Sequence, residues 1–390
     1  MRVLHVTSYF LTHETRVFKT TESAVRLGFA TSVDIVGRSR VDLPCIERIC
    51  PGRSAIRVKA NLPRNIIGRG IGFASWSRRV LMQFRGRGYS VVCCHSLACL
   101  PVSFLLAKFN RASLIYEPHE LETETSRVPR GPVRTIARWI ERLLARQADA
   151  VIVVGHEIAS WYRAEYGLKR VWVVMNCPQS ADAYRSDLIR RSIGSPAGLP
   201  IFLYQGILSK GRGLETAITA FRQLEHAAVF VMMGYGPLEG RLKEEISGLS
   251  NIFILPAVPP HEVLRWTASA DFGLSLIEPI SLSYEFCVPN KLFEYVMAKL
   301  PVLASATTEQ RRIIEGFGLG RICTQLDAKG VCDAVRLMIA EGASKYQSAL
   351  ARARSELNWE RQEDVLAEVY GEIARTRAAR GESVRRENTW

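Results

Sequence analysis

The chain has 390 residues, 47% of them hydrophobic and 23% charged, and a formal net charge of +14. This composition excludes extensive disorder, and the length predicts two domains rather than a single core. The nine cysteines lack the spacing of a metal site, so we expect free thiols in a reducing compartment. No signal peptide fits the N-terminus, which favours a cytoplasmic protein.

The positive charge belongs to the first half of the chain. Residues 1–180 hold 27 Lys and Arg against 13 Asp and Glu, whereas residues 181–390 hold 25 of each. The segment 52–88 has nine basic residues, no acid and several interleaved apolar side chains. A second basic cluster follows at Arg127, Arg130, Arg134, Arg138, Arg142 and Arg146. Three interpretations stay open: a solvated helix face, an anionic membrane surface, or nucleic acid, for which no recognised motif is present.

In the first half, short β-branched runs alternate with helical patterns, which is typical of parallel α/β structure. We predict strands at 3–7, 31–36, 90–94, 113–116, 150–154 and 171–175. A helix is expected over 16–27, capped by Gly28, and another over 134–147. In the second helix, apolar side chains at Ile136, Ile140, Leu143 and Leu144 share one face and arginines line the other.

The second half of the chain repeats this alternation of strands and helices after a segment of different composition. Residues 181–200 lack an apolar run and are predicted as an interdomain linker. Strands are then expected at 201–205, 228–233, 252–255, 271–276, 301–304 and 321–323. The predicted domains are a Rossmann-like domain over 1–180, a second over 201–360, and a C-terminal helix with a basic tail over 361–390. Two such halves place a ligand in a cleft at the strand carboxyl ends.

The segment 288–305 carries the strongest functional signal, because it combines a helix start, one carboxylate and a following strand. Pro289 suits a first helical turn, and the free N–H groups after it can bind an anion beside Lys291. Glu294 lies roughly one turn further along, where it can accept hydrogen bonds from ligand hydroxyls. A phosphate and sugar hydroxyls bound together describe a nucleotide.

Three other segments fit the same ligand. Residues 206–213 form a glycine-rich turn with Lys210 and Arg212, which could approach a phosphate, and residues 234–237 could form a wall for a nucleotide. Both could equally be structural turns. Residues 116–124 place four carboxylates around His119, either as an active-site loop in which His119 donates to a substrate hydroxyl or as partners of nearby arginines.

The ordered set of these segments resembles the family-4, group 1 class of retaining glycosyltransferases with the GT-B fold. The matching pieces begin at His13, Tyr116, Ala148, Val173, Tyr204, Gly234, Val288 and Leu357 and span nearly the whole chain. The resemblance implies two Rossmann-like domains facing across a central cleft, with a C-terminal helix crossing back to the N-terminal domain. It implies sugar transfer from a nucleotide diphosphate sugar, with UDP as the favoured carrier, to an acceptor hydroxyl with retained configuration.

In this family the C-terminal domain holds the nucleotide and the N-terminal domain holds the acceptor. No metal and no other cofactor are expected, because basic side chains and helix dipoles neutralise the diphosphate. By position, Glu294 should bind the ribose, Arg212 should replace a phosphate-binding lysine, and His119 should contact the donor sugar.

Two departures from the family pattern affect the site. Ile207 replaces the usual phosphate arginine, and Phe286 stands where the first glutamate of a pair is expected. Either the neighbouring Glu285 substitutes for it, or backbone N–H groups hold the sugar. The predicted site therefore comprises His119 and Glu285 as catalytic residues and Gly206, Lys210, Arg212, Gly234, Gly236, Asn290, Lys291, Leu292 and Glu294 as binding residues.

The leading hypothesis is a cytoplasmic enzyme at the inner face of the plasma membrane. It would add a sugar to a lipid-linked glycan in polysaccharide or glycoconjugate biosynthesis, without binding nucleic acid. A nucleotide-sugar 2-epimerase on the same fold is one alternative, with the acidic loop 117–124 supplying acid and base groups. A non-enzymatic basic binding module is the other.

Overall fold

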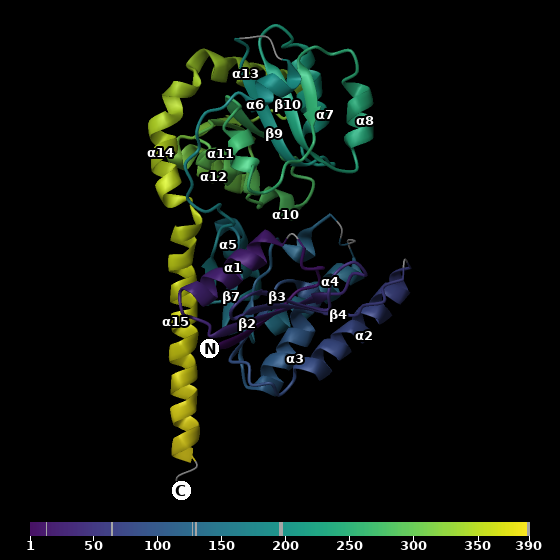
Figure 1. Cartoon of the computed structure of the whole chain (residues 1–390), viewed down its shortest axis with the longest axis vertical. Helices are drawn as coiled ribbons and strands as arrows, with labels where there is room; N and C mark the ends of the chain where they lie inside the picture. Colours follow the sequence, from purple (N-terminus) through teal and green to yellow (C-terminus); the bar gives the residue numbers. More distant parts are fainter. Residues whose placement is uncertain (13, 64, 127, 129–130, 195–197, 388–390) are drawn as a thin grey trace. The chain divides into compact units, whose positions relative to one another are not determined.

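The computed structural model describes residues 1–12, 14–63, 65–126, 128, 131–194 and 198–387. The predictions at His13, Arg127 and Arg130 lie outside these residues. The chain forms two compact units, Met1–Val174 with Glu363–Trp390, and Met175–Gln362 (Figure 1). Each unit is a mainly parallel sheet flanked by helices, so the predicted two-domain α/β architecture is confirmed.

The sheet of the first unit has the strand order β3-β4-β2-β1-β5-β6-β7-β8, and only the β3–β4 pair is antiparallel. The strands are β1 (Arg2–Val6), β2 (Ser32–Arg38), β3 (Ile46–Cys50), β4 (Arg53–Val58), β5 (Val91–Cys94), β6 (Ser113–Tyr116), β7 (Ala150–Val153) and β8 (Val171–Val173). All six predicted strands fall on observed ones. The sequence patterns did not predict β3 and β4. Strand β3 is an exposed edge strand, and β4 contains two buried arginines, Arg53 and Arg57, which interrupt its apolar residues.

The helices of this unit are α1 (Thr15–Arg26), α2 (Ile66–Phe84), α3 (Leu100–Asn110), α4 (Pro132–Ala145) and α5 (His156–Tyr166), with short 3-10 turns at Leu97–Cys99 and Glu122–Glu124. From Glu363 onward, the last helix of the chain, α15 (Trp359–Glu387), belongs to this unit, and its Tyr370 ring stacks on Phe29 with centroids 5.4 Å apart.

Helix α4 turns its apolar side outward. Ile136 and Trp139 are 58% and 64% exposed, whereas Glu141 is fully buried. The Glu141 carboxylate accepts hydrogen bonds from the hydroxyls of Tyr116 and Tyr162, both at 2.6 Å, and of Tyr166 at 2.8 Å. Because a buried carboxylate must keep such partners, this cluster fixes which side of α4 faces the sheet.

The second unit contains a six-stranded parallel sheet of order β11-β10-β9-β12-β13-β14. Its strands are β9 (Ile201–Ile207), β10 (Val229–Tyr235), β11 (Ile252–Leu255), β12 (Phe272–Ser275), β13 (Val302–Ser305) and β14 (Gly320–Cys323). Its helices are α6 (Leu188–Ile193), α7 (Leu214–Arg222), α8 (Glu239–Glu245), α9 (Val263–Thr267), α10 (Leu282–Glu285), α11 (Asn290–Met297), α12 (Thr308–Phe317), α13 (Ala328–Glu341) and α14 (Gln347–Glu356). Each of the six predicted strands corresponds to one of these.

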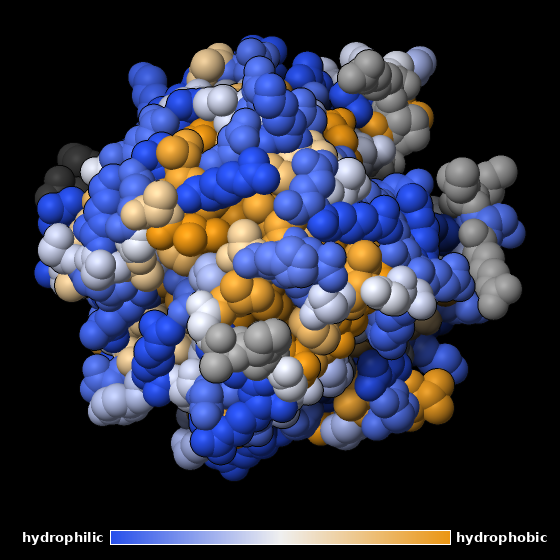
Figure 2. Space-filling model, turned by 90° about the horizontal axis from the view of Figure 1, so that it is seen from above, coloured by the Kyte–Doolittle hydropathy of each residue, from blue (hydrophilic) through white to orange (hydrophobic). Residues whose placement is uncertain are grey.

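The predicted linker 181–200 lies inside the second unit. It contains α6, and Ile189 is fully buried in an apolar cluster together with Cys177 and Leu203. A second cluster, which includes Phe202, Phe221 and other side chains, forms another part of the core of this unit. In the view of Figure 2, hydrophilic residues predominate on the surface and hydrophobic ones emerge between them.

We expect Glu141→Ala to destabilise the protein by about 3 kcal/mol or more, because three buried tyrosine hydroxyls would lose their acceptor. Urea unfolding measures this change, with the exposed Glu165 on α5, replaced by Ala, as the matched control. A loss below about 1 kcal/mol would show that the cluster does not hold α4.

Candidate functional site

The carboxyl end of β9 meets α11 through Gln205. Its side-chain amide donates to the Glu294 carboxylate, and its amide oxygen accepts the Thr267 hydroxyl at 2.7 Å. The backbone N–H of Gln205 donates to the Tyr295 hydroxyl oxygen at 3.2 Å. Gln205 therefore fixes the position of Glu294, the predicted ribose ligand. Sequence reasoning gave Gln205 no role, although it directly precedes the glycine-rich turn.

Lys291 lies beside the same strand end. Its ammonium nitrogen is 3.4 Å from the centre of the Tyr204 ring, and its side chain is close to Gly206. Burial lowers the pKa of Lys291 well below its usual value, the Arg212 charge lowers it further, and Glu294 opposes both. An anion bound here would add to the effect of Glu294 and favour the charged form of Lys291.

The glycine-rich turn 206–213 places Arg212 near Lys291. The Arg212 guanidinium lies over the Tyr284 ring, 5.1 Å from its centre, while Lys210 is exposed. Gly213 has a φ of +65°, and a Cβ there would lie 2.4 Å from the carbonyl oxygen of Leu276. Only glycine fits at this point, directly before α7.

The second turn is equally tight. A Cβ on Gly234 would lie 1.9 Å from the carbonyl oxygen of Gly206, and one on Gly236 would lie 2.3 Å from that of Leu208. The structure thus explains both glycines by close packing of the β9 and β10 ends. Whether they also form a wall for a nucleotide stays a prediction.

The start of α11 differs in detail from the expected one. Pro289 has an extended backbone and precedes the helix as its N-cap, so the first helical residue is Asn290. Asn290 is exposed and its side-chain oxygen accepts a hydrogen bond from Asn176 at 3.0 Å. The Leu292 side chain is fully buried and its N–H donates to the Pro289 carbonyl at 3.0 Å, and its role in binding stays a prediction.

Glu285 has a structural partner that the sequence did not reveal. Its carboxylate accepts hydrogen bonds from the backbone N–H of Thr308 at 3.0 Å and from the Thr308 hydroxyl at 2.6 Å. It therefore stabilises the start of α12. Its predicted role on the donor sugar remains a prediction.

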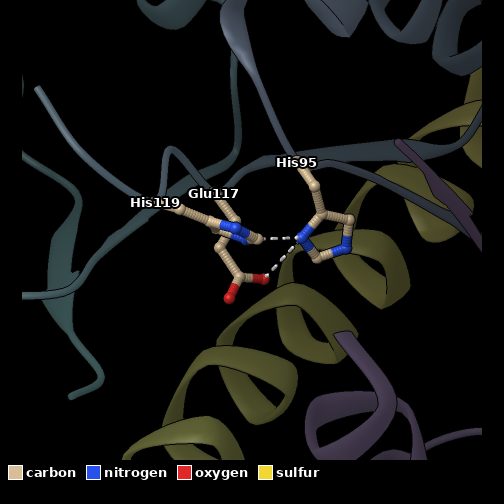
Figure 3. A group of neighbouring side chains, drawn as sticks. All are labelled: His95, Glu117 and His119. Carbon is tan, nitrogen blue, oxygen red and sulfur yellow. Dashed lines mark hydrogen bonds and ion pairs between the residues drawn. The ribbon is translucent and has the colours of Figure 1, made fainter. Parts of the chain in front are cut away.

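In the first unit, His119 belongs to a chain of three imidazoles. His5 Nδ1 lies 2.7 Å from His95 Nε2, and His95 Nδ1 lies 3.2 Å from His119 Nε2. Figure 3 shows that Glu117 and His119 both point toward His95, whose Nδ1 is 3.6 Å from the Glu117 carboxylate. Arg16 donates to the other oxygen of that carboxylate at 2.7 Å. Sequence reasoning found His119 but not His5 or His95.

The contacts of the acidic loop confirm one of the two interpretations that the sequence left open, pairing with arginines, while its role as an active-site loop stays a prediction. Glu117 pairs with Arg16, and Glu124 pairs with Arg138 at 2.7 Å, so two of its acids do serve arginines. Glu122 instead accepts the backbone N–H of Leu97 at 2.7 Å, and burial raises its pKa to about 8.

The ligand atoms of His95, Glu117 and His119 lie within 4.8 Å of one another, which is close enough for a small cation. Arg16 argues against that use. Its guanidinium already neutralises the carboxylate and would repel a second positive charge in the same buried place. Hydrogen bonding explains these three side chains better than metal binding does.

The chain matches two family models. Residues 13–178 match a glycosyl transferase 4-like domain, and residues 199–341 match glycosyl transferases group 1. Together the two matches cover most of the chain. A search among curated proteins finds no match.

Solved structures resemble the chain over almost its whole length. Sucrose-phosphate synthase from Thermosynechococcus elongatus is 16% identical with a TM-score of 0.80, covering 96% of this chain and 100% of its own. HepE from Anabaena in complex with UDP and glucose is 13% identical with a TM-score of 0.73, covering 95% and 99%. WaaG, a glycosyltransferase involved in lipopolysaccharide biosynthesis, is 16% identical with a TM-score of 0.65, covering 96% and 99%. These likenesses show the GT-B fold. The two domain matches show that the chain belongs to the glycosyltransferases that combine a 4-like domain with a group 1 domain.

Proposed function

We propose that this protein transfers a sugar from a UDP-sugar to an acceptor hydroxyl with retention of configuration. The observation that carries the proposal is the grouping of Lys291, Arg212 and Glu294 around the carboxyl end of β9. Ligands of open parallel sheets bind at this edge. UDP is the proposed carrier because HepE, on the same fold, forms complexes with UDP and UDP-glucose.

The two ends of a nucleotide diphosphate fit different groups of this site. Lys291 and Arg212 offer positive charge to the diphosphate, with Lys210 at the exposed side of the turn. The Glu294 carboxylate, held by the Gln205 amide, accepts hydrogen bonds from the ribose hydroxyls. Charge that develops on the leaving diphosphate then meets preorganised cations, so the proposed reaction requires no metal.

The roles of His119 and Glu285 follow from the family resemblance. We assign His119 to the donor sugar as a hydrogen-bond donor. Glu285 can contribute only if its carboxylate serves the sugar while it caps α12. Backbone N–H groups of Asn290 and Lys291 are the other source of contacts to the sugar.

We expect Glu294→Ala to weaken UDP binding by about ten- to a hundredfold, because hydrogen bonds to a charged group are lost. Calorimetric titration with UDP measures this, and product analysis with donor and acceptor follows transfer. Glu244→Ala, on the exposed side of α8, is the matched control.

Two results would count against the proposal. Unchanged UDP affinity in Glu294→Ala would refute the ribose assignment. Conversion of the donor sugar with no acceptor present would instead identify a 2-epimerase.

We further propose that the acceptor is lipid-linked and that the first unit docks on an anionic membrane. The support is the exposed apolar stripe on α4, formed by Val133, Ile136, Trp139 and Leu143, which the buried Glu141 keeps on the outer side. Exposed Leu105 and Phe109 lie on the neighbouring α3. Exposed Arg142 on α4 and exposed Arg146, which directly follows the helix, add positive charge.

This surface is suited to the membrane interface rather than to its interior. Apolar and aromatic side chains next to basic ones are typical of helices that lie in the headgroup region. No helix within the described part of the chain is both long and apolar enough to cross a membrane.

We expect the double variant Ile136→Ser and Trp139→Ser to bind anionic vesicles at least about tenfold more weakly, because two apolar side chains no longer insert. Co-sedimentation with vesicles of graded anionic lipid content measures this. Leu337→Ser on α13, where Leu337 is 50% exposed in the other unit, is the control. Binding that does not depend on anionic lipid would refute the docking proposal.

A further inference from the structure

Three imidazoles form a continuous hydrogen-bonded chain inside the first unit. His5 lies on β1, His95 directly follows β5, and His119 follows β6, so all three come from adjacent strands. His5 is fully buried and His95 is 1% exposed, while His119 is only partly buried. The chain therefore runs from the core toward the surface and ends at the residue assigned to the donor sugar.

All three imidazoles are neutral at physiological pH. Burial lowers the pKa of His95 to about 3, with Arg16 as a second cause. Burial also lowers the pKa of His5 and of His119 well below 6.5, and the neighbouring His95 adds to the effect on both. A neutral imidazole carries one N–H and one lone pair. The two hydrogen bonds of the chain can therefore run in only two directions, outward from His5 to His119 or inward.

Two observations select the outward direction. The Glu117 carboxylate is 3.6 Å from His95 Nδ1, where a proton is favoured and a lone pair is repelled. The second concerns His5 Nε2, which is buried and has no partner among the described residues. The inward direction would place an unpaired N–H at that nitrogen, whereas the outward direction leaves only a lone pair there. Buried N–H groups without an acceptor are the rarer case in proteins.

We propose that His5 and His95 act as positioning residues that hold His119 in the tautomer with its proton on Nδ1. In the outward direction His5 Nδ1–H donates to His95 Nε2, and His95 Nδ1–H donates to His119 Nε2. His119 Nδ1 then carries a proton and presents a hydrogen-bond donor to a ligand oxygen. This extends the role proposed above for His119, and it excludes His119 Nδ1 as a base that removes a proton from the acceptor.

Nitrogen NMR of the full chain labelled at histidine tests the tautomer without any substrate. We expect His119 Nδ1 to give a protonated, pyrrole-type signal and Nε2 a pyridine-type signal. The reverse assignment would overturn the proposal. Because this readout needs no sugar transfer, it decides the tautomer even if the proposed function fails.

Variants of His95 separate positioning from packing. His95→Asn keeps an N–H close to the position of Nδ1, whereas His95→Phe removes it and keeps the ring. We expect His119 to keep its tautomer in His95→Asn and to become a mixture in His95→Phe, with kcat/KM for the donor about tenfold lower in His95→Phe. Equal effects of both variants on tautomer and rate would contradict the proposal. His226→Phe, at an exposed histidine, is the control.

If His95→Phe does not fold, His5→Phe tests the same chain from its inner end. It leaves His95 without the N–H that donates to its Nε2, so we expect His119 to lose its fixed tautomer. Retention of the Nδ1–H form in a folded His5→Phe protein would overturn the role of His5.

The neutral chain also predicts sensitivity to acid. Groups whose pKa is lowered in the folded protein contribute stability that is present above their unfolded pKa, near 6.5, and is lost as the pH falls. The charged and titratable groups around the chain are Arg16 on α1, Arg53 on β4, Cys93 on β5, Glu117 after β6 and Tyr370 on α15.

Below pH 6.5, each of the three histidines should lower the equilibrium constant for folding about tenfold per pH unit. This holds as long as the pH stays above the pKa of that histidine in the folded protein. Denaturant unfolding between pH 6.5 and 4.5 measures this. We expect the folding equilibrium constant of His5→Phe to fall about tenfold less per pH unit than that of the natural protein. Equal pH dependence of the two proteins would show that His5 takes up its proton without unfolding.

Discussion

The ion pair between Arg16 and Glu117 is the interaction on which the first unit depends. Arg16 donates to the Glu117 carboxylate and, through a second nitrogen, to the carbonyl of Val174 at 2.8 Å. One side chain of α1 thereby joins the segment after β6 to the segment after β8. Removing one partner of such a buried pair typically costs about 3–5 kcal/mol. The same carboxylate determines the direction of the histidine chain, so a structural contact and a chemical property share one residue.

In the second unit, too, one buried side chain joins several segments, but through a neutral amide rather than an ion pair. Gln205 satisfies Thr267 and Glu294 at once, and Tyr295 donates to the carbonyl of Leu203 at 2.8 Å. These side chains come from β9, α9 and α11, which meet where the parallel strands end. Because the protein itself holds Glu294 and Lys291, little conformational freedom remains to be lost when a ligand arrives.

Much of this organisation could be predicted from the sequence because buried parallel strands leave short, continuous apolar runs. The apolar runs that end at Gln205 and at Tyr116 indicated the positions of the candidate nucleotide site and of the loop that contains His119. The edge strand β3 left no such run, and the capping of Thr308 by Glu285 joins residues too far apart for local pattern reading. His5 and His95 could have been found, since His5 lies within a predicted strand and His95 directly follows the next strand of the sheet. A lone histidine in an apolar run is, however, more often an ordinary core residue.

The burial of Lys291 couples ligand binding to protons. Its pKa is lowered by burial, and a diphosphate beside it would favour the charged ammonium form. At any pH at which the lysine of the empty site is partly neutral, nucleotide binding in the proposed site would take up a proton from solution, and release of the nucleoside diphosphate would return it. The affinity for the nucleotide would fall as the pH rises through the pKa of Lys291 in the empty site. The same lysine that holds the leaving group would thus make its departure easier in a more alkaline solution.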